Sequence, residues 1–208
     1  SYLGKFYEQI ESLEKLRKDA DYNTGTITSS SALLLYSIVL YFKPSVIAEV
    51  GSFIGKSTFS MAFAADTYKN NYETIIHTCD NSNDIDFPNL TSTKIIQYKK
   101  KSSTEMFSAL DKSITIDLIH IDGRLQKEDF PLIKNLLRDE TIFVLDDFET
   151  VEKGVINYLN LINFKVIDKS SYCLINLVPI DIKKKFNLYG KSTTAFLIPY
   201  KFIKFTTQ

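Results

Sequence analysis

The 208-residue chain contains no tryptophan, two cysteines, seven glycines and five prolines, and its 25 Lys and Arg are balanced by 25 Asp and Glu. Cys79 and Cys173 are too few and too far apart for a disulfide framework or a paired metal-ligand motif, which favours a reducing, cytoplasmic location. The balanced charge provides no overall field to attract nucleic acid or an anionic membrane, so we expect neither as a partner.

Long apolar runs and flexible linkers are also missing. The most apolar early stretch, Ala32–Phe42, is about half as long as a membrane-spanning helix. With glycine and proline scarce and a length that suits one α/β domain, we predict a single domain over 1–208. It divides into N-terminal helices (1–43), a central core (44–165) and a strand-rich C-terminal part (166–208).

From residue 46 onward, short apolar runs rich in β-branched residues alternate with segments of helical periodicity. The expected strands are Val46–Val50, Thr74–Thr78, Lys94–Tyr98, Ile116–Ile121 and Thr141–Leu145, followed in the tail by Phe164–Ile167, Tyr172–Val178 and Thr194–Pro199. The expected helices between or after them are Gly55–Tyr68, Ser103–Leu110, Lys127–Leu137 and Val151–Ile162. Apolar strands joined by helices predict an α/β fold with a doubly wound, mostly parallel sheet covered on both faces.

A glycine-containing segment, Glu49–Gly55, follows the first expected strand. Gly51 and Gly55 allow a tight turn and a close approach of the backbone to a ligand, and the next helix directs its free amides at that turn. The second strand ends near Asp80, a carboxylate suited to both hydroxyls of a ribose. The segment therefore predicts a site for a nucleotide or an adenosine compound.

In this context Ala48–Thr58 resembles the first motif of class I S-adenosylmethionine-dependent methyltransferases, and His77–Asp80 resembles their second motif. The resemblance extends in order and spacing over about residues 24–165, and it implies a Rossmann-like, seven-stranded fold and S-adenosylmethionine as cofactor. It places Glu49 near the cofactor's amino group, Asp80 at the ribose and Ser102 and Ser103 near adenine, although Ser102 and Ser103 could equally cap a helix. The implied cofactor-binding residues are Glu49, Gly51, Ser52, Gly55, Ser57, Asp80, Ser102, Ser103 and Asp122.

Two other nucleotide-binding patterns compete with this interpretation. Gly51–Ser57 is similar to a phosphate-binding P-loop, but three residues separate its glycines where a P-loop has four. The closely spaced glycines of a dinucleotide dehydrogenase are absent from the segment. Both alternatives rank below a methyltransferase.

Three carboxylates, Asp122, Asp146 and Asp147, follow the fourth and fifth expected strands. Neighbouring parallel strands end at the same edge of a sheet, so these side chains can converge on Mg²⁺ or a similar hard cation. The alternative is that each caps its own turn. Ile119–Gly123 together with Val144–Phe148 resembles the metal-dependent O-methyltransferases of the catechol and sugar-modifying type, and implies these three carboxylates as metal ligands.

The sequence departs from that resemblance after Gly123, where Arg124 and Leu125 stand in place of an acid and a histidine. Asp122 or Lys127 could then take the acceptor's proton, and Arg124 could bind an anionic acceptor.

We therefore predict methyl transfer from S-adenosylmethionine to a hydroxyl of a small molecule or sugar, assisted by a divalent metal. A metal-independent methyltransferase is the alternative, followed by a P-loop-like nucleotide-binding protein. The loops 81–93 and 180–192 and the first helix are candidate lids, and the first helix and the tail could cover a homodimer interface.

Overall fold

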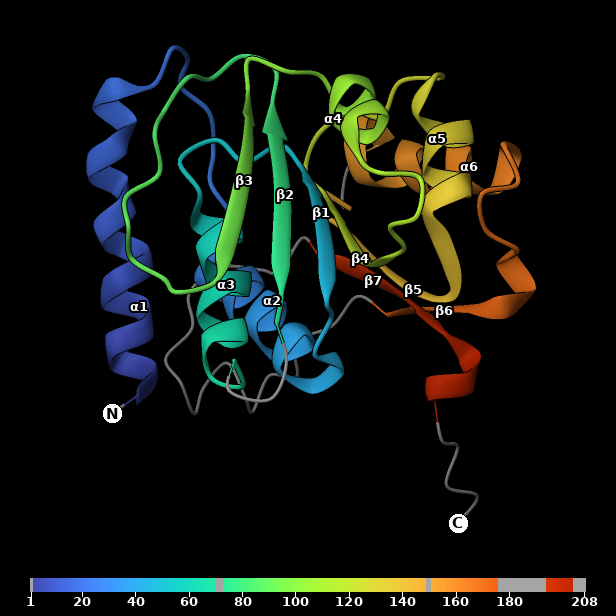
Figure 1. Ribbon diagram of the computed structural model, residues 1–208, viewed down its shortest axis with the longest axis horizontal. Coiled ribbons are helices and arrows are strands. Elements are labelled where there is room, and N and C mark those ends of the chain that lie inside the picture. Colours follow the sequence, from blue (N-terminus) through green and yellow to red (C-terminus); the bar gives the residue numbers. More distant parts are fainter. Residues whose placement is uncertain (1, 70–72, 149–150, 176–193, 204–208) are drawn as a thin grey trace.

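The computed structural model of the protein, drawn in Figure 1, describes residues 2–69, 73–148, 151–175 and 194–203. Within these ranges seven strands form one sheet in the order β3-β2-β1-β4-β5-β7-β6. The strands are β1 Val46–Val50, β2 Ile75–Asp80, β3 Lys94–Lys99, β4 Ile116–Ile121, β5 Leu137–Leu145, β6 Tyr172–Ile175 and β7 Ala195–Pro199. The first five are parallel, whereas β7 runs antiparallel to both β5 and β6. This confirms the predicted α/β fold and its mostly parallel sheet.

Helices cover both faces of the sheet. They are α1 Tyr2–Ser12, α2 Ser29–Phe42, α3 Lys56–Asp66, α4 Ser103–Ala109, α5 Asp129–Leu136 and α6 Ile156–Asn163. A 3₁₀ helix, Leu13–Asp19, continues α1, and a π-helical turn, Val151–Val155, leads into α6. Among the described helices none is long and apolar enough to cross a membrane.

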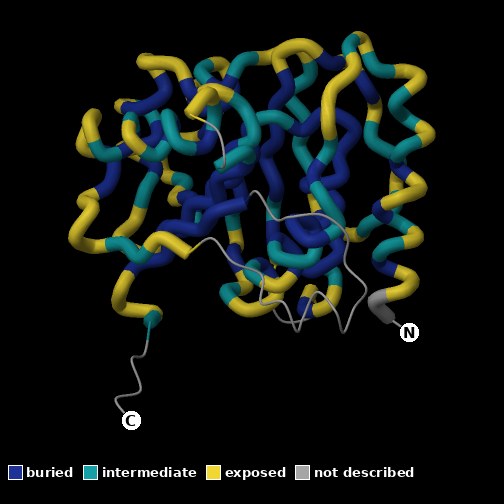
Figure 2. The backbone as a smooth tube through the Cα atoms, turned by 180° about the vertical axis from the view of Figure 1, so that it is seen from behind, coloured by how far each residue is buried: buried dark blue, intermediate teal, exposed yellow. Residues whose placement is uncertain are grey.

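Alternation along each central strand divides the core between the two faces. In β1, Ile47 packs in the apolar cluster with α1, α2 and α3, whereas Ala48 and Val50 pack in the cluster with α4, α5 and α6. Strands β1, β2 and β4 and the second half of β5 are mostly buried in Figure 2, whereas β3 at the end of the sheet is intermediate to exposed. The sheet is therefore a rigid support whose loops at one edge are free to form a site.

The tail differs from the prediction in one strand. Phe164–Ile167 is not a strand, because the chain there closes the end of α6 in a Schellman motif. The amide of Val166 donates to the carbonyl of Leu161, and Lys165 takes a left-handed φ of 54°. The expected strand over 172–178 is present as far as Ile175, and its last three residues lie outside the described ranges.

Candidate functional site

The carboxyl ends of β1, β4 and β5 lie side by side at one end of the sheet. There the first residue after each strand still donates a backbone hydrogen bond to the neighbouring strand. The amide of Gly51 donates to the carbonyl of Cys79, the amide of Asp122 donates to Val50, and the amide of Asp146 donates to Ile121, each at 2.9 Å. The strand order reverses between β1 and β4, since the chain proceeds outward from β1 through β2 and β3 and then returns to β4. Ligands of open α/β sheets bind at such a reversal.

Two glycines allow the loop after β1 to approach the loops that follow β4 and β2. Gly51 has a φ of +91°, and a Cβ added there would lie 3.1 Å from the carbonyl carbon of Asp122 and 3.1 Å from the amide nitrogen of Gly123. Gly55 has a φ of +85° and begins α3, and its Cβ would lie 2.9 Å from the ring of Phe87. Side chains at these positions would strain the backbone and separate the loops.

A cavity of about 150 Å³ lies beside Gly51 and contains five of the predicted cofactor-binding residues. These five are Gly51, Asp80, Ser102, Ser103 and Asp122. Ser52 lines a smaller adjoining space with Phe53 and Asp80. The structure thus brings together residues from the ends of β1, β2, β3 and β4 that are up to 71 positions apart in sequence.

Asp80 connects this cavity to the N-terminal segment. Its Oδ2 accepts hydrogen bonds from the amide of Phe53 and from the hydroxyl of Tyr22, both at 2.9 Å, and its Oδ1 accepts from the amide of Ser82 at 3.0 Å. Tyr22 also lines the cavity and packs its ring 5.1 Å from that of Phe53. Tyr22 was missed in the sequence because its loop precedes the strands by more than 20 residues and carries no recognisable motif.

Glu49 lies beneath the site and is fully buried. Its carboxylate accepts hydrogen bonds from Thr58 at 2.5 Å, Thr78 at 2.6 Å and His120 Nδ1 at 3.1 Å. Burial opposes ionisation of Glu49, but the hydrogen bond and charge of His120, with bonds from Ser57 and Thr58, bring its pKa below the ordinary value. Glu49 is therefore hydrogen-bonded to buried side chains, Ser57 among them, and neither Glu49 nor Ser57 lines the cavity.

The two serines after β3 hold the loop above the cavity. Ser102 caps α4, accepting from the amide of Glu105 while the Glu105 side chain accepts from the amide of Ser102, a reciprocal capping box. The hydroxyl of Ser103 donates to Asp129 at 2.6 Å, and Asp129 is fully buried. Asp129 thereby joins the start of α4 to the start of α5.

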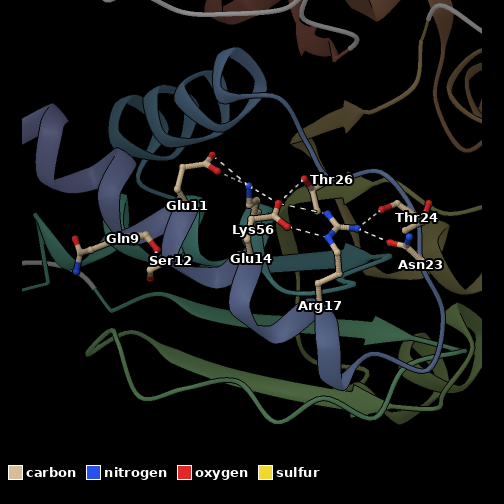
Figure 3. A network of polar contacts seen from close by, with 9 residues as sticks. All are labelled: Gln9, Glu11, Ser12, Glu14, Arg17, Asn23, Thr24, Thr26 and Lys56. Atoms are coloured by element: carbon tan, nitrogen blue, oxygen red, sulfur yellow. Dashed lines mark hydrogen bonds and ion pairs between the residues drawn. The ribbon is translucent and has the colours of Figure 1, made fainter.

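Lys56, the residue that gives the glycine segment its P-loop appearance, is held away from the cavity. Its Nζ lies 2.7 Å from Glu14 Oε1 and 3.1 Å from Glu11 Oε2, and Arg17 binds Glu14 in turn (Figure 3). A P-loop lysine has to reach the phosphates of its ligand. The side chain of Lys56 instead fastens the N-terminal helices to the start of α3, which disfavours the nucleotidase alternative.

Asp122, Asp146 and Asp147 come together as the sequence predicts, with ligand oxygens that all lie within 4.8 Å of one another. Burial, and then the charge of Asp146, raise the pKa of Asp122 to about 7. Asp146 is buried and accepts a hydrogen bond from Thr194 at 2.7 Å, and Asp147 has a left-handed φ of 52°. The donor set and spacing suit a hard divalent cation.

A lysine that the sequence reasoning missed contacts these carboxylates. Lys153 Nζ lies 2.7 Å from Asp147 Oδ2 and 3.5 Å from Asp122 Oδ1. Lys127, the predicted proton acceptor, is exposed before α5, and no ion pair among the described residues joins it to the three carboxylates. Lys153 comes from the turn before α6, so only the folded chain brings it to the ends of β4 and β5.

A shallow groove of about 450 Å³ adjoins the cavity through Arg124, which lines both. Its other walls include Leu125 and Val151, and Arg124 forms an exposed ion pair with Glu152 at 3.5 Å. Buried Asn157 fixes this side of the site, donating to the carbonyl of Gly123 at 2.8 Å and accepting from the amide of Leu125 at 3.2 Å. The candidate lid loop 81–93 is described, whereas 180–192 lies outside the described ranges.

Comparison with known proteins agrees with this arrangement. Residues 48–148 match the family described as a methyltransferase domain. The O-methyltransferase TomG from Streptomyces achromogenes, solved in complex with S-adenosylmethionine, is 13% identical with a TM-score of 0.60, over 91% of this chain and 88% of that one. An O-methyltransferase from Bacillus cereus, solved with S-adenosylhomocysteine, is 14% identical with a TM-score of 0.58, over 92% and 90%. No curated protein matches the chain.

The sheet order and the cavity at the point where that order reverses are those of a Rossmann-like α/β fold, the fold that these solved methyltransferases share. The match over residues 48–148 identifies that part of the chain as a methyltransferase domain, and it confirms the prediction of an S-adenosylmethionine-dependent methyltransferase.

Proposed function

We propose that the protein transfers the methyl group of S-adenosylmethionine to a hydroxyl of a small molecule or sugar, assisted by a divalent cation at Asp122, Asp146 and Asp147. One observation carries the proposal: Asp122 belongs both to the cavity lined by Gly51 and Asp80 and to the group of three carboxylates. A donor in the cavity and an acceptor at the carboxylates would therefore meet at this residue.

The cavity residues suit the donor. Gly51 lines the cavity where the methionine portion would lie, and the Asp80 carboxylate can accept hydrogen bonds from the ribose hydroxyls. Ser103 lines the cavity, is anchored by Asp129, and would lie beside the adenine. Holding the donor in one orientation against its acceptor accounts for much of the acceleration expected of a methyl transfer.

The carboxylates suit an acceptor that presents oxygen atoms. A divalent cation bound by them would lower the pKa of an acceptor hydroxyl and hold it in place for attack. Asp146 is fixed by Thr194, and the loop carrying Asp122 is fixed through Asn157, so the carboxylates are preorganised. The groove beside Arg124 provides apolar surface for the rest of a small acceptor. The fold shared with TomG, which acts in tomaymycin synthesis, is consistent with such an acceptor.

Metal-independent methyl transfer is the second candidate, and Lys153 favours it. The Lys153 ammonium group contacts Asp122 and Asp147. It therefore neutralises part of the negative charge that a metal ion would otherwise have to neutralise.

The proposal is tested by measuring S-adenosylhomocysteine release with a panel of catechols and sugars. We expect Asp146→Asn or a chelator to lower turnover at least tenfold, because a cation at the reacting oxygens contributes several kcal/mol. Binding of S-adenosylmethionine to Asp146→Asn, measured by calorimetry, should stay within about twofold of wild type, because Asp146 does not line the cavity. Asp139→Asn, an exposed position at the far end of β5, is the matched control. Turnover that survives both the chelator and Asp146→Asn would rule out the metal role.

A further inference from the structure

Lys153 occupies the position of a counterion for the three carboxylates. We propose that its ammonium group and a divalent metal ion compete for Asp122 and Asp147, so that metal entry displaces the lysine and Lys153 sets the metal affinity of the site. This inference rests on the proposed function, because it takes the carboxylates as metal ligands.

The contacts of Lys153 carry the first step. One nitrogen lies within 2.7 Å of Asp147 Oδ2 and within 3.5 Å of Asp122 Oδ1, and the ligand oxygens of both residues lie within 4.8 Å of that of Asp146. The shorter contact has the length of a charge-assisted hydrogen bond. Lys153 therefore bridges carboxylates from two neighbouring strand ends, as a metal ion would.

The backbone around Lys153 is built for this approach. Gly154 is buried, and a Cβ added there would lie 2.5 Å from the carbonyl oxygen of Asp146 and 2.7 Å from the Cα of Phe148. Only glycine allows the turn 151–155 to pack against the loop that carries Asp146 and Asp147. The packing of this turn therefore holds the backbone of Lys153 close to the carboxylates, and the side-chain rotamer then brings the ammonium group into contact with them.

Electrostatics makes the two cations exclusive. Three carboxylates this close together repel one another, and a cation of either kind relieves that repulsion. An ammonium group bonded to Asp147 and a divalent ion at the same oxygens would be like charges at contact distance, and a partly buried position screens their repulsion poorly. The lysine side chain is 35% exposed, so it has a path into solvent when the ion enters.

The competition is measured by titrating the full chain with Mn²⁺ and following the free ion by electron paramagnetic resonance. Lys153→Met should bind Mn²⁺ roughly tenfold more tightly than wild type, the change expected on removal of one competing charge-assisted contact. Lys153→Arg keeps the charge and should stay near the wild-type affinity. Lys134→Met, an exposed lysine on α5, is the matched control. Calorimetry with S-adenosylmethionine checks that each variant is folded.

Each outcome decides a different point. Wild-type affinity, or weaker binding, in Lys153→Met overturns the competition while leaving the metal site in place, provided that Asp146→Asn abolishes Mn²⁺ binding. Wild-type and Lys153→Met proteins that both bind S-adenosylmethionine but no Mn²⁺ overturn the metal role in the proposed function, and the competition with it. Binding by Lys153→Met alone supports the competition in its strongest form, with the lysine holding the site against the metal.

Discussion

Glu14 connects the N-terminal helices to the start of α3, and its substitution by glutamine gives a prediction with a defined pH dependence. The hydrogen bond from Arg17, opposed by burial and aided by Lys56, lowers the pKa of Glu14 from 4.5 to about 2 (Figure 3). For a fully shielded group such a shift corresponds to about 3 kcal/mol of stability. The side chain of Glu14 is 37% exposed, so solvent screening reduces the expected loss in Glu14→Gln to roughly 1–2 kcal/mol.

The direction of the pH dependence follows from the lowered pKa of Glu14. Ionised Glu14 stabilises the fold fully above pH 4.5, and this contribution declines as the pH falls toward about 2. Urea denaturation at pH 7 and at pH 3 should therefore give a difference between wild type and Glu14→Gln that is large at pH 7 and at least halved at pH 3. Glu8→Gln, at an exposed position in the preceding helix α1, should cost little at either pH. A Glu14→Gln cost that is equal at both pH values would refute the assignment of the effect to this ion pair.

Three further substitutions test the site and its support. Asp80→Asn should weaken S-adenosylmethionine binding at least tenfold in calorimetry, because hydrogen bonds to a charged group contribute about 1.5–3 kcal/mol; unchanged affinity would exclude Asp80 from the donor site. Gly51→Ala should lower the free energy of unfolding by about 1–3 kcal/mol, given its φ of +91°, and a stability equal to wild type in urea would contradict the strain. Glu49→Gln leaves His120 buried without its charged partner and should cost about 3–5 kcal/mol in the same assay, whereas a loss below about 1 kcal/mol would mean that the pair is not ionised.

The central sheet and the carboxylates were predictable from sequence because each depends on short-range pattern and a general property of parallel sheets. The run Ile116–Ile121, which lies between segments of helical periodicity, favours a strand buried on both faces, and parallel strands end at one edge of the sheet. Asp122 and Asp146 therefore had to lie near each other. Phe164–Ile167 was wrongly predicted as a strand because a short apolar run can also form a helix-terminating turn, and the left-handed residue of this turn is Lys165 instead of a glycine.

Lys153 and Tyr22 were beyond sequence reasoning for a different reason. Each is one of many similar residues, and its role arises from a tertiary contact with a carboxylate 6 to 58 positions away. Glu49 and Ser57 illustrate the reverse case, since their positions in the first motif imply contact with the cofactor whereas the structure bonds them to buried partners. A pattern of residues identifies the strand end, but side-chain direction depends on which partners the neighbouring strands supply.

Diffraction from crystals grown with S-adenosylhomocysteine and Mn²⁺ tests the central claim most directly. We expect an anomalous peak for manganese between Asp122, Asp146 and Asp147, the side chain of Lys153 turned away from them, and S-adenosylhomocysteine in the cavity beside Gly51 and Asp80. S-adenosylhomocysteine bound in the cavity with no manganese at the carboxylates, and with Lys153 still bonded to Asp147, would contradict the metal-assisted mechanism.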